Sequence, residues 1–384
     1  MDPLVELLPE LQDLITQHFD VKDFIELTTV SKLWNENLGK SNQCLKKIKF
    51  TLRYWIGLAG TKQDQREAMI KVLQSTMRTY QHVTIDCRFD KSLSLEVWKF
   101  FSFLGSSVVE LKIKSIKLDY PTEIQLTKLK ILKLTYVPIN VRNILLVGCR
   151  QLTRLKLKME SPLKWSENSR ADHESLESVK RCMLRNQNLE SIELHGSVQY
   201  NLFFENSFSD DVRFKLKHLK LKTGMRLALI SAMHELNLVK FLATQSKSLE
   251  SFFIDVCRPH IIQHVFNKMP ALTSIHFDVM ILNDYNVREL KLILNEKIED
   301  LKIPYVNQHQ DIREFLEVVP NLKSLFVAHL SHETMEFIAR NLMSLVSLKY
   351  RYDEIDCEEF YDRLKDDFPE VNQDIEMIVD YEYT

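Results

Sequence analysis

The chain has 384 residues, of which 45% are hydrophobic and 27% charged, the composition of a soluble globular protein with a substantial core. Its first residues, MDPLVELLPE, lack the basic flank and apolar run of a signal peptide. No uncharged apolar segment reaches the roughly 18 residues needed to span a bilayer. We therefore expect an intracellular protein, cytoplasmic or nuclear, with no membrane partner.

Charge is distributed unevenly along the chain, although the net value is only −2. Residues 354–384 contain 12 acidic and 2 basic residues, so the preceding part carries about +8. Six cysteines are scattered with no C-x-x-C pair, which favours reduced, buried thiols over disulfides or a zinc site. They are Cys44, Cys87, Cys149, Cys182, Cys257 and Cys357.

Residues 8–38 predict three short amphipathic helices. Pro9 suits a first helical turn, and the first helix has apolar spacing at Leu11, Leu14, Ile15, His18 and Phe19. Asp23 with Glu26 is typical of a second helix start, and Ser31 can cap a third helix that carries Trp34. A segment this short cannot bury enough apolar surface to offset the conformational entropy that it loses on folding. Either the next domain or another protein must therefore cover its apolar faces.

This segment resembles the F-box, the module that docks a receptor onto a cullin-based (SCF) ubiquitin ligase. The similar positions are Leu8-Pro9-Glu10, Ile15, Phe19-Asp20, Asp23-Phe24, Leu27, Val30-Ser31-Lys32 and Trp34. The resemblance implies a Skp-family adaptor and a cullin as partners. It implies adaptor contacts at Leu8, Pro9, Ile15, Phe19, Phe24, Leu27, Val30 and Trp34, with Phe19 and Phe24 standing where the family more often has Leu. The alternative is a helical cap on the following domain.

Residues 41–79 are interpreted as a linker and N-terminal cap, with a helix over about 64–80. A recurring L-x-x-L-x-L pattern follows, which places alternate apolar residues under a short strand. Its copies end at residues 113, 134, 157, 194, 221, 254, 277, 303, 327 and 350, with weaker copies at 80–85 and 45–50. Most separations are 21 to 28 residues, the period of leucine-rich repeats.

The repeats resemble leucine-rich repeats over residues 80–352, including a cysteine-type detail at Cys149 and Cys257. Between strands, helical spacing at Val287, Leu290, Leu292 and Ile293, and again at Thr334, Phe337 and Ile338, predicts a strand-plus-helix unit. The expected fold class is α/β: a three-helix F-box (1–40), then a horseshoe with parallel inner strands and outer helices. Residues 353–384 predict a capping helix, with Phe360, Leu364 and Phe368 on one side, and an acidic tail.

No enzymatic pattern is found. The chain has no glycine-rich phosphate loop, no G-x-S-x-G and no H-E-x-x-H, so we expect neither enzyme activity nor a cofactor. His260 and His264 could share a helix face, but no third metal ligand is evident. Solvated or hydrogen-bonded histidines are the simpler interpretation.

Alternation along the strands sends the leucines into the core and their neighbours to the predicted concave face. We predict substrate binding there, with an acidic or phosphorylated protein segment as the target. The candidate residues form a basic arc followed by aromatic positions: Lys112, Lys114, Lys133, Arg154, Lys156, Lys158, Lys220, Lys222, Phe253 and Phe326. The alternative is that these lysines are simply solvated.

Two long inter-strand stretches, 158–176 and 199–214, are a second candidate surface. They are predicted to expose Trp165, Phe203, Phe204 and Phe208. The alternative is that they are plain insertions.

The sequence as a whole predicts the substrate-recognition subunit of an SCF ubiquitin ligase, which directs a protein target to degradation and catalyses nothing itself. A non-degradative scaffold is the first alternative. Nucleic-acid binding through the basic arc is another, against which the net charge of −2 and the acidic tail argue.

Overall fold

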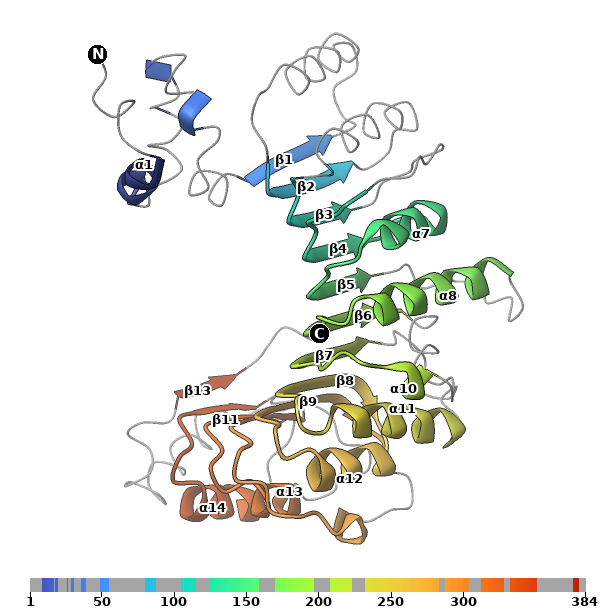
Figure 1. The fold of residues 1–384 in the computed structure, drawn as a ribbon. Coiled ribbons are helices and arrows are strands. Elements are labelled where there is room, and N and C mark those ends of the chain that lie inside the picture. The colour runs from blue at the N-terminus through green and yellow to red at the C-terminus, as the bar shows by residue number, and fades with distance from the viewer. Residues whose placement is uncertain are drawn as a thin grey trace. The chain divides into compact units, whose positions relative to one another are not determined.

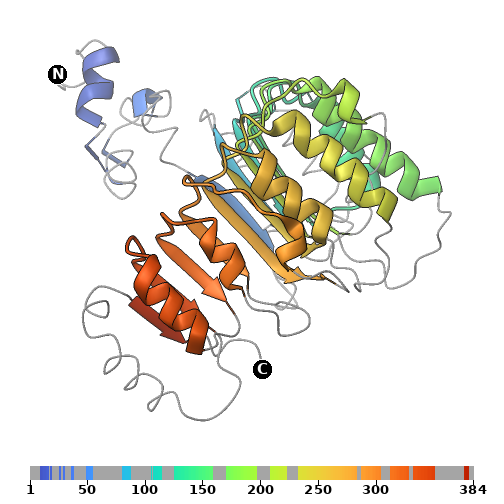
Figure 2. The same cartoon turned by 90° about the horizontal axis from the view of Figure 1, so that it is seen from below.

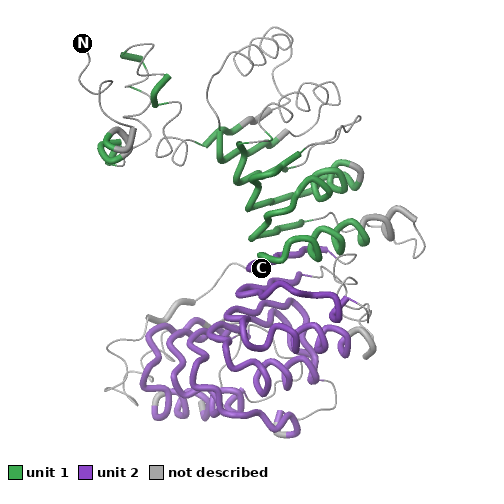
Figure 3. The backbone as a smooth tube through the Cα atoms, viewed as in Figure 1, with its two compact units in different colours: residues 1–189 green, residues 190–384 purple. Residues whose placement is uncertain are grey.

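The computed structural model describes residues 9–16, 18–19, 26, 29–30, 36–38, 49–54, 80–87, 105, 107–114, 125–158, 170–196, 208–222, 232–282, 287–303, 312–327, 332–350 and 376–379. The chain divides into two compact units, residues 1–189 (unit 1) and residues 190–384 (unit 2), coloured separately in Figure 3. Each unit is described by itself. None of the helices in these ranges is long and apolar enough to cross a bilayer.

Unit 1 begins with the helix α1 (Pro9–Thr16) and continues into a parallel sheet. Its strands are β1 (Lys49–Tyr54), β2 (His82–Cys87), β3 (Glu110–Lys114), β4 (Ile131–Thr135) and β5 (Arg154–Lys158). Each strand pairs in parallel with the next along the chain. The helix α7 (Ile139–Gly148) follows β4, and α8 (Arg170–Arg185) follows β5 (Figure 1).

Unit 2 repeats the same arrangement. Its strands are β6 (Ser191–His195), β7 (His218–Lys222), β8 (Ser251–Cys257), β9 (Ser274–Met280), β10 (Asp300–Ile303), β11 (Ser324–Val327), β12 (Ser347–Tyr350) and β13 (Glu376–Val379). They also pair in parallel in chain order. The connections contain α10 (Phe208–Asp211), α11 (Ala232–Gln245), α12 (Pro259–Lys268), the 3₁₀ helix η4 (Val287–Leu290), α13 (Arg313–Glu317) and α14 (His332–Asn341).

Burial alternates along most of the strands, as a strand with one covered face requires. In β3, Leu111 and Ile113 are fully buried, whereas Glu110, Lys112 and Lys114 are partly exposed. The buried side chains lie on the face that carries the helices, which Figures 1 and 2 show on one side of the strands of each unit. The parallel strands and the strand-plus-helix repeat predicted from the L-x-x-L-x-L pattern are therefore confirmed.

A second regularity joins successive repeats just before each strand. The N–H of Lys130 donates to Val109 O at 2.9 Å, and the N–H of Thr153 donates to Lys130 O at 2.8 Å. The same link recurs in unit 2, for example from Glu250 to Lys217 and from Thr273 to Glu250, both at 2.8 Å. Each repeat thus satisfies backbone groups of its neighbour, so the units depend on stacking for stability.

The structure corrects four predictions. The strand at residues 45–50 is shifted: β1 begins at Lys49, and Phe50 pairs with Val83. The predicted helix over residues 287–293 is only the 3₁₀ turn η4. Strand β13 pairs with β12, although the C-terminal segment was expected to contain no strand. The N-terminal helix ends at Thr16, because the N–H groups of His18 and Phe19 bond to Ile15 O and Thr16 O in a tight turn. The predicted helices near 64–80 and 360–368 lie outside the described residues.

Candidate functional site

The first candidate surface is the exposed apolar side of α1. Leu11, Leu14 and Ile15 occupy neighbouring positions on this helix and are 44%, 57% and 37% exposed, whereas Thr16 is buried. An amphipathic helix normally turns its apolar side towards a core. In this helix three large apolar side chains face solvent, which is typical of a protein-interaction surface.

The predicted adaptor contacts lie partly in the described residues. Pro9 is the first residue of α1, as its position in the sequence predicted. Val30 is exposed at 64% and Phe19 is half-buried. Residues 26, 29–30 and 36–38 are helical, in agreement with helical segments in this part of the chain. Leu8, Phe24, Leu27 and Trp34 lie outside the described residues.

The second candidate surface is the open face, defined as the side of each unit's sheet formed by the first, third and fifth residues of its strands. In unit 1 the third residues of β3, β4 and β5 are Lys112, Lys133 and Lys156, and the parallel register places them directly side by side. We call these three residues the lysine row. Lys114, Arg154 and Lys158 flank it on β3 and β5. The sheet therefore brings together all six of the predicted basic residues of unit 1.

Glu110 is the main acidic group on this face. Lys133 Nζ donates to Glu110 Oε1 at 2.7 Å, and His82 Nδ1 lies 3.1 Å from Glu110 Oε2. Burial alone would raise the pKa of Glu110, but the hydrogen bonds from Lys133 and His82 outweigh it and hold that pKa below its ordinary value. Glu110 is thus ionised and engaged by two partners.

Four other cations on this face are less well neutralised. Lys114 Nζ lies 3.9 Å from Asp86 Oδ2, a loose pair. Lys158 Nζ lies 5.2 Å from the centroid of the Tyr136 ring. Within the described residues, Lys112 and Arg154 form no ion pair with a carboxylate. Positive charge is therefore left over on this face.

The open face of unit 2 is organised around Phe253. Its ring is only 6% exposed, because Lys220 Nζ and Lys222 Nζ lie 4.6 and 4.9 Å from the ring centroid. The His276 ring meets it edge-on at 4.3 Å. Phe253 therefore lies on the predicted face, but it is covered by its neighbours and is not an exposed aromatic contact. Each lysine gains a cation–π interaction in return.

Acidic side chains balance these two lysines. Lys220 Nζ lies 3.8 Å from Glu193 Oε1, which is also 2.7 Å from His195 Nε2. Lys222 Nζ lies 3.6 Å from Asp278 Oδ2, and His276 Nε2 lies 2.8 Å from Asp278 Oδ1. Burial would raise the pKa of Asp278, but His276 and Lys222 together lower it. The predicted basic arc thus carries an excess of positive charge in unit 1, whereas carboxylates balance its positive charge in unit 2.

Phe326 lies on the open face of unit 2 with Lys349 Nζ 5.3 Å from its ring centroid, and it is only half-buried. By contrast, the prediction that Phe208 is exposed is wrong. Phe208 is fully buried and stacks on Phe241 with centroids 5.8 Å apart, because α10 packs its first residue into the core of unit 2. Residues 170–176, expected in a loop, are the first two turns of α8. Trp165, Phe203 and Phe204 lie outside the described residues.

His264 and the cysteines of the described residues belong to no group that could hold a metal ion. His264 is half-buried on α12, and burial lowers its pKa, with Lys268 adding to the shift. Across the ranges that the structure describes, no group of three or more His, Cys, Asp or Glu residues could hold a metal ion. Cys149, Cys182 and Cys257 are buried free thiols, and Cys149 Sγ donates to Leu145 O at 3.0 Å. The prediction of reduced, buried thiols is confirmed for these three.

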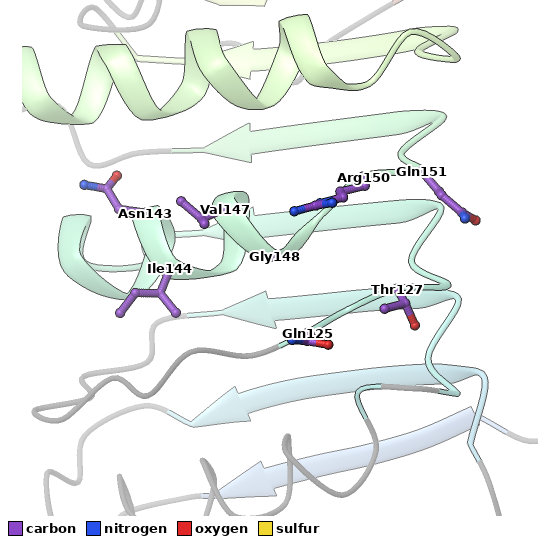
Figure 4. A pocket seen from close by; sticks show the side chains of 8 residues that line it. All are labelled: Gln125, Thr127, Asn143, Ile144, Val147, Gly148, Arg150 and Gln151. Atoms are coloured by element: carbon purple, nitrogen blue, oxygen red, sulfur yellow. The ribbon is translucent and has the colours of Figure 1, made fainter.

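A hollow of about 610 Å³ lies beside α7 in unit 1 (Figure 4). Its lining is made of polar and aliphatic side chains: Gln125, Thr127, Asn143, Ile144, Val147, Gly148, Arg150 and Gln151. Asn143 Oδ1 is buried and accepts no hydrogen bond from the described residues. The described part of the lining offers hydrogen-bond acceptors and one cation, Arg150, but no carboxylate, imidazole or thiol. These eight residues therefore include no grouping for acid–base or nucleophilic catalysis.

Sequence reasoning missed Glu110 and Glu193, which help to decide how basic each open face is. A signal was present, because Glu110 and Glu193 stand inside the motif copies VVELKI and LESIEL. It also missed Tyr136, which has a positive φ of 54° directly after β4. No pattern in the sequence marks that position.

Comparison with protein-family models gives no match for this chain, and no curated protein that was compared matches its sequence.

Proposed function

We propose that the chain is a substrate-recognition subunit of an SCF-type ubiquitin ligase. In this proposal residues 1–40 form a three-helix F-box that binds the Skp-family adaptor and, through it, the cullin. The strand-plus-helix repeats form a leucine-rich-repeat horseshoe that holds a protein target. The chain would work inside the cell, in the cytoplasm or the nucleus, and would carry no cofactor.

The exposed apolar side of α1 is the observation that carries the proposal. Leu14 and Ile15 face solvent in the part of the sequence where the F-box pattern begins with Leu8-Pro9-Glu10. Exposed apolar groups on a short helix gain about 25 cal/mol for each Å² that a partner covers. An adaptor protein that packs against α1 would supply this cover. The alternative of a helical cap would require the rest of the chain to supply it.

The mechanism in this proposal is proximity. Tethering a target near the conjugating enzyme of the ligase converts a bimolecular transfer into an effectively intramolecular one. The receptor then needs no acid, base or nucleophile of its own. The open faces of the two units provide the binding area, and their ion-paired side chains are suited to polar recognition.

A pull-down from cell lysate tests the adaptor contact. The unchanged chain should capture the adaptor and the cullin, whereas Leu14→Asp combined with Ile15→Asp should lose both. The matched control is Leu236→Asp combined with Leu294→Asp, since these leucines are similarly exposed, at 51% and 57%, but lie in unit 2. Equal capture by the α1 variant and the control, or no capture by the unchanged chain, would remove the ligase proposal.

The non-degradative scaffold remains the competing function and needs a separate measurement. If the chain is a receptor for degradation, its depletion from cells should lengthen the half-life of proteins that bind its repeats. A scaffold would capture the adaptor equally well but leave those half-lives unchanged.

A further inference from the structure

We propose that the open face of unit 1 binds an Asp/Glu-rich segment of a protein partner, which lies across β3, β4 and β5 on the lysine row. This inference rests on the proposed function and names the class of target that such a receptor would take. It also narrows the predicted basic arc to its unit 1 part. The binding surface is assigned to the basic residues of unit 1 and not to Lys220 and Lys222 of unit 2.

The register of the sheet is the first step. Lys112 pairs with Lys133, and Lys133 pairs with Lys156, so three ammonium-bearing side chains start from adjacent strands at the same level. Neighbouring strands are about 4.8 Å apart, and like charges at such spacing repel one another. Carboxylates from a partner that lie between the lysines would remove this repulsion. The unbound face is thus complementary to an anionic segment.

The charge balance of the two open faces is the second step. The open-face side chains of β2–β5 include six cations and two carboxylates, Asp86 and Glu110. Those of β6–β12 include four lysines and four carboxylates. With His counted as neutral, the open-face side chains of β2–β5 carry +4 and those of β6–β12 carry no net charge. An anionic partner is therefore attracted to unit 1.

The state of the individual cations is the third step. Within the described residues, Lys112 and Arg154 have no acidic partner, and Lys114 has only a loose pair with Asp86. In unit 2, Lys220 and Lys222 each contact both a carboxylate and the Phe253 ring. A ligand that bound these lysines would have to displace internal partners. A ligand on unit 1 would meet Lys112 and Arg154, which have no acidic partner within the described residues, and would compete with Glu110 only at Lys133.

The kind of anion follows from the residue types. Five of the six cations are lysines, which act as point charges, and only Arg154 has the planar fork that binds phosphate with two parallel hydrogen bonds. Separate carboxylates fit a row of point charges. Along an extended peptide, side chains on one side repeat every 6.6 Å or so, so two carboxylates fit within a row of three lysines.

Fluorescence anisotropy with the full chain tests the proposal. The probe is a labelled peptide of alternating glutamate and serine, and the matched peptide carries glutamine in place of glutamate. The unchanged chain should bind the acidic peptide, with affinity that falls as salt rises, and should not bind the glutamine peptide. Two further probes are a peptide with a single phosphoserine and a single-stranded oligonucleotide of the same net charge as the acidic peptide. Both should bind at least tenfold more weakly than the acidic peptide.

The decisive variant is Lys112→Glu combined with Arg154→Glu, because neither side chain forms an ion pair with another residue that the structure describes. We expect at least a tenfold loss of affinity for the acidic peptide. Lys247→Glu combined with Lys297→Glu is the control, since it changes net charge equally at exposed positions of unit 2, and its affinity should stay within about twofold. If the glutamate variant misfolds by circular dichroism, Lys112→Gln with Arg154→Gln gives the same test with smaller perturbation.

No binding of the acidic peptide, equal losses in both variants, or tighter binding of the phosphopeptide or the oligonucleotide would overturn the proposal. Adaptor capture separates this outcome from the fate of the proposed function. The Lys112 and Arg154 variant should still capture the adaptor through α1. If it does so while the unchanged chain ignores the acidic peptide, only the target class assigned here is wrong.

Discussion

The side-chain oxygen of Asn186 accepts the backbone N–H of Leu152 at 2.7 Å in the interior of unit 1. The amide nitrogen of Asn186 donates to Cys182 O at 2.6 Å and to Cys149 O at 3.3 Å. One buried side chain thus satisfies backbone groups of two successive repeats. Gln245 does the same in unit 2 by accepting the N–H of Leu216 at 2.8 Å.

Asn186→Ala should destabilise unit 1, because it leaves several buried backbone groups without a partner. The expected cost is roughly 2 to 4 kcal/mol, which corresponds to a thermal midpoint lower by roughly 5 to 10 °C. Differential scanning calorimetry measures this shift. Asn188→Ala is the control, because Asn188 is exposed and lies only two residues further along the chain, and its midpoint should move by no more than about 1 °C. Equal midpoints for the two variants would contradict the role given to Asn186.

Tyr136 and Gly196 occupy equivalent positions after their strands. Substitution of the tyrosine should change stability little, whereas substitution of the glycine should lower it. Each follows its strand with positive φ, 54° and 122°, and each donates its N–H to the last residue of the next strand, Lys158 O or Lys222 O, at 2.7 Å. Tyr136→Gly relieves a left-handed backbone but loses the contact with Lys158, so stability should change by less than about 1 kcal/mol. Gly196→Ala places a Cβ at a φ that only glycine tolerates and should cost roughly 1 to 3 kcal/mol.

Thermal midpoints of the two variants, measured side by side, check this pair. A large loss for Tyr136→Gly would mean that the tyrosine ring, and not the turn, is what unit 1 needs at this position.

Glu110 should make stability depend on pH. The folded-state pKa lies below the ordinary value, so the ionised form is favoured in the folded state. This contribution is fully present above the unfolded pKa of about 4.3 and is lost as the pH falls through the folded pKa. Urea unfolding between pH 7 and pH 3 should therefore show a smaller acid-induced loss for Glu110→Gln than for the unchanged chain. Identical pH profiles would show that Lys133 and His82 do not stabilise the carboxylate.

The buried thiols should resist alkylation while the chain is folded. Burial raises the pKa of Cys182 to about 12 and also raises the pKa values of Cys149 and Cys257, so the reactive thiolate is scarce at pH 8. Iodoacetamide treatment followed by peptide mass spectrometry should find these three unmodified in buffer and modified in guanidinium chloride. Rapid labelling of Cys182 in buffer would show that α8 opens readily.

Most of the fold could be predicted from the sequence. A half-buried strand places an apolar residue at every second position, and stacked repeats make the whole strand pattern recur at a longer interval. Each strong L-x-x-L-x-L copy became a strand with its leucines buried. The copy near residue 45 was misplaced, since Phe50 and Leu52 fill the positions next to Val83 and Ile85 that Ile48 and Phe50 were expected to fill. Two apolar residues separated by one polar residue recur there, so the pattern fits two registers.

The candidate site was less predictable, because ion pairing depends on register between strands. The sequence shows that Lys220 and Lys133 both follow a leucine in a strand, but not that one meets Glu193 and Phe253 while the other meets Glu110. Which cations remain without a carboxylate partner depends on the side chains that the neighbouring strands place beside them. Only the structure separates a neutral face from a basic one.

Strand β13 occupies the edge of the sheet at which a second copy of the chain could pair with β12. A parallel sheet that ended at β12 would offer its unpaired N–H and C=O groups to any other extended chain. β13 pairs with that edge, and it comes from the most acidic part of the sequence, with Glu376 in the strand. A second copy that approached this end would meet the same concentration of negative charge. Glu376 thus places negative charge on the last strand of the sheet, which disfavours the edge-to-edge pairing by which open sheets form aggregates.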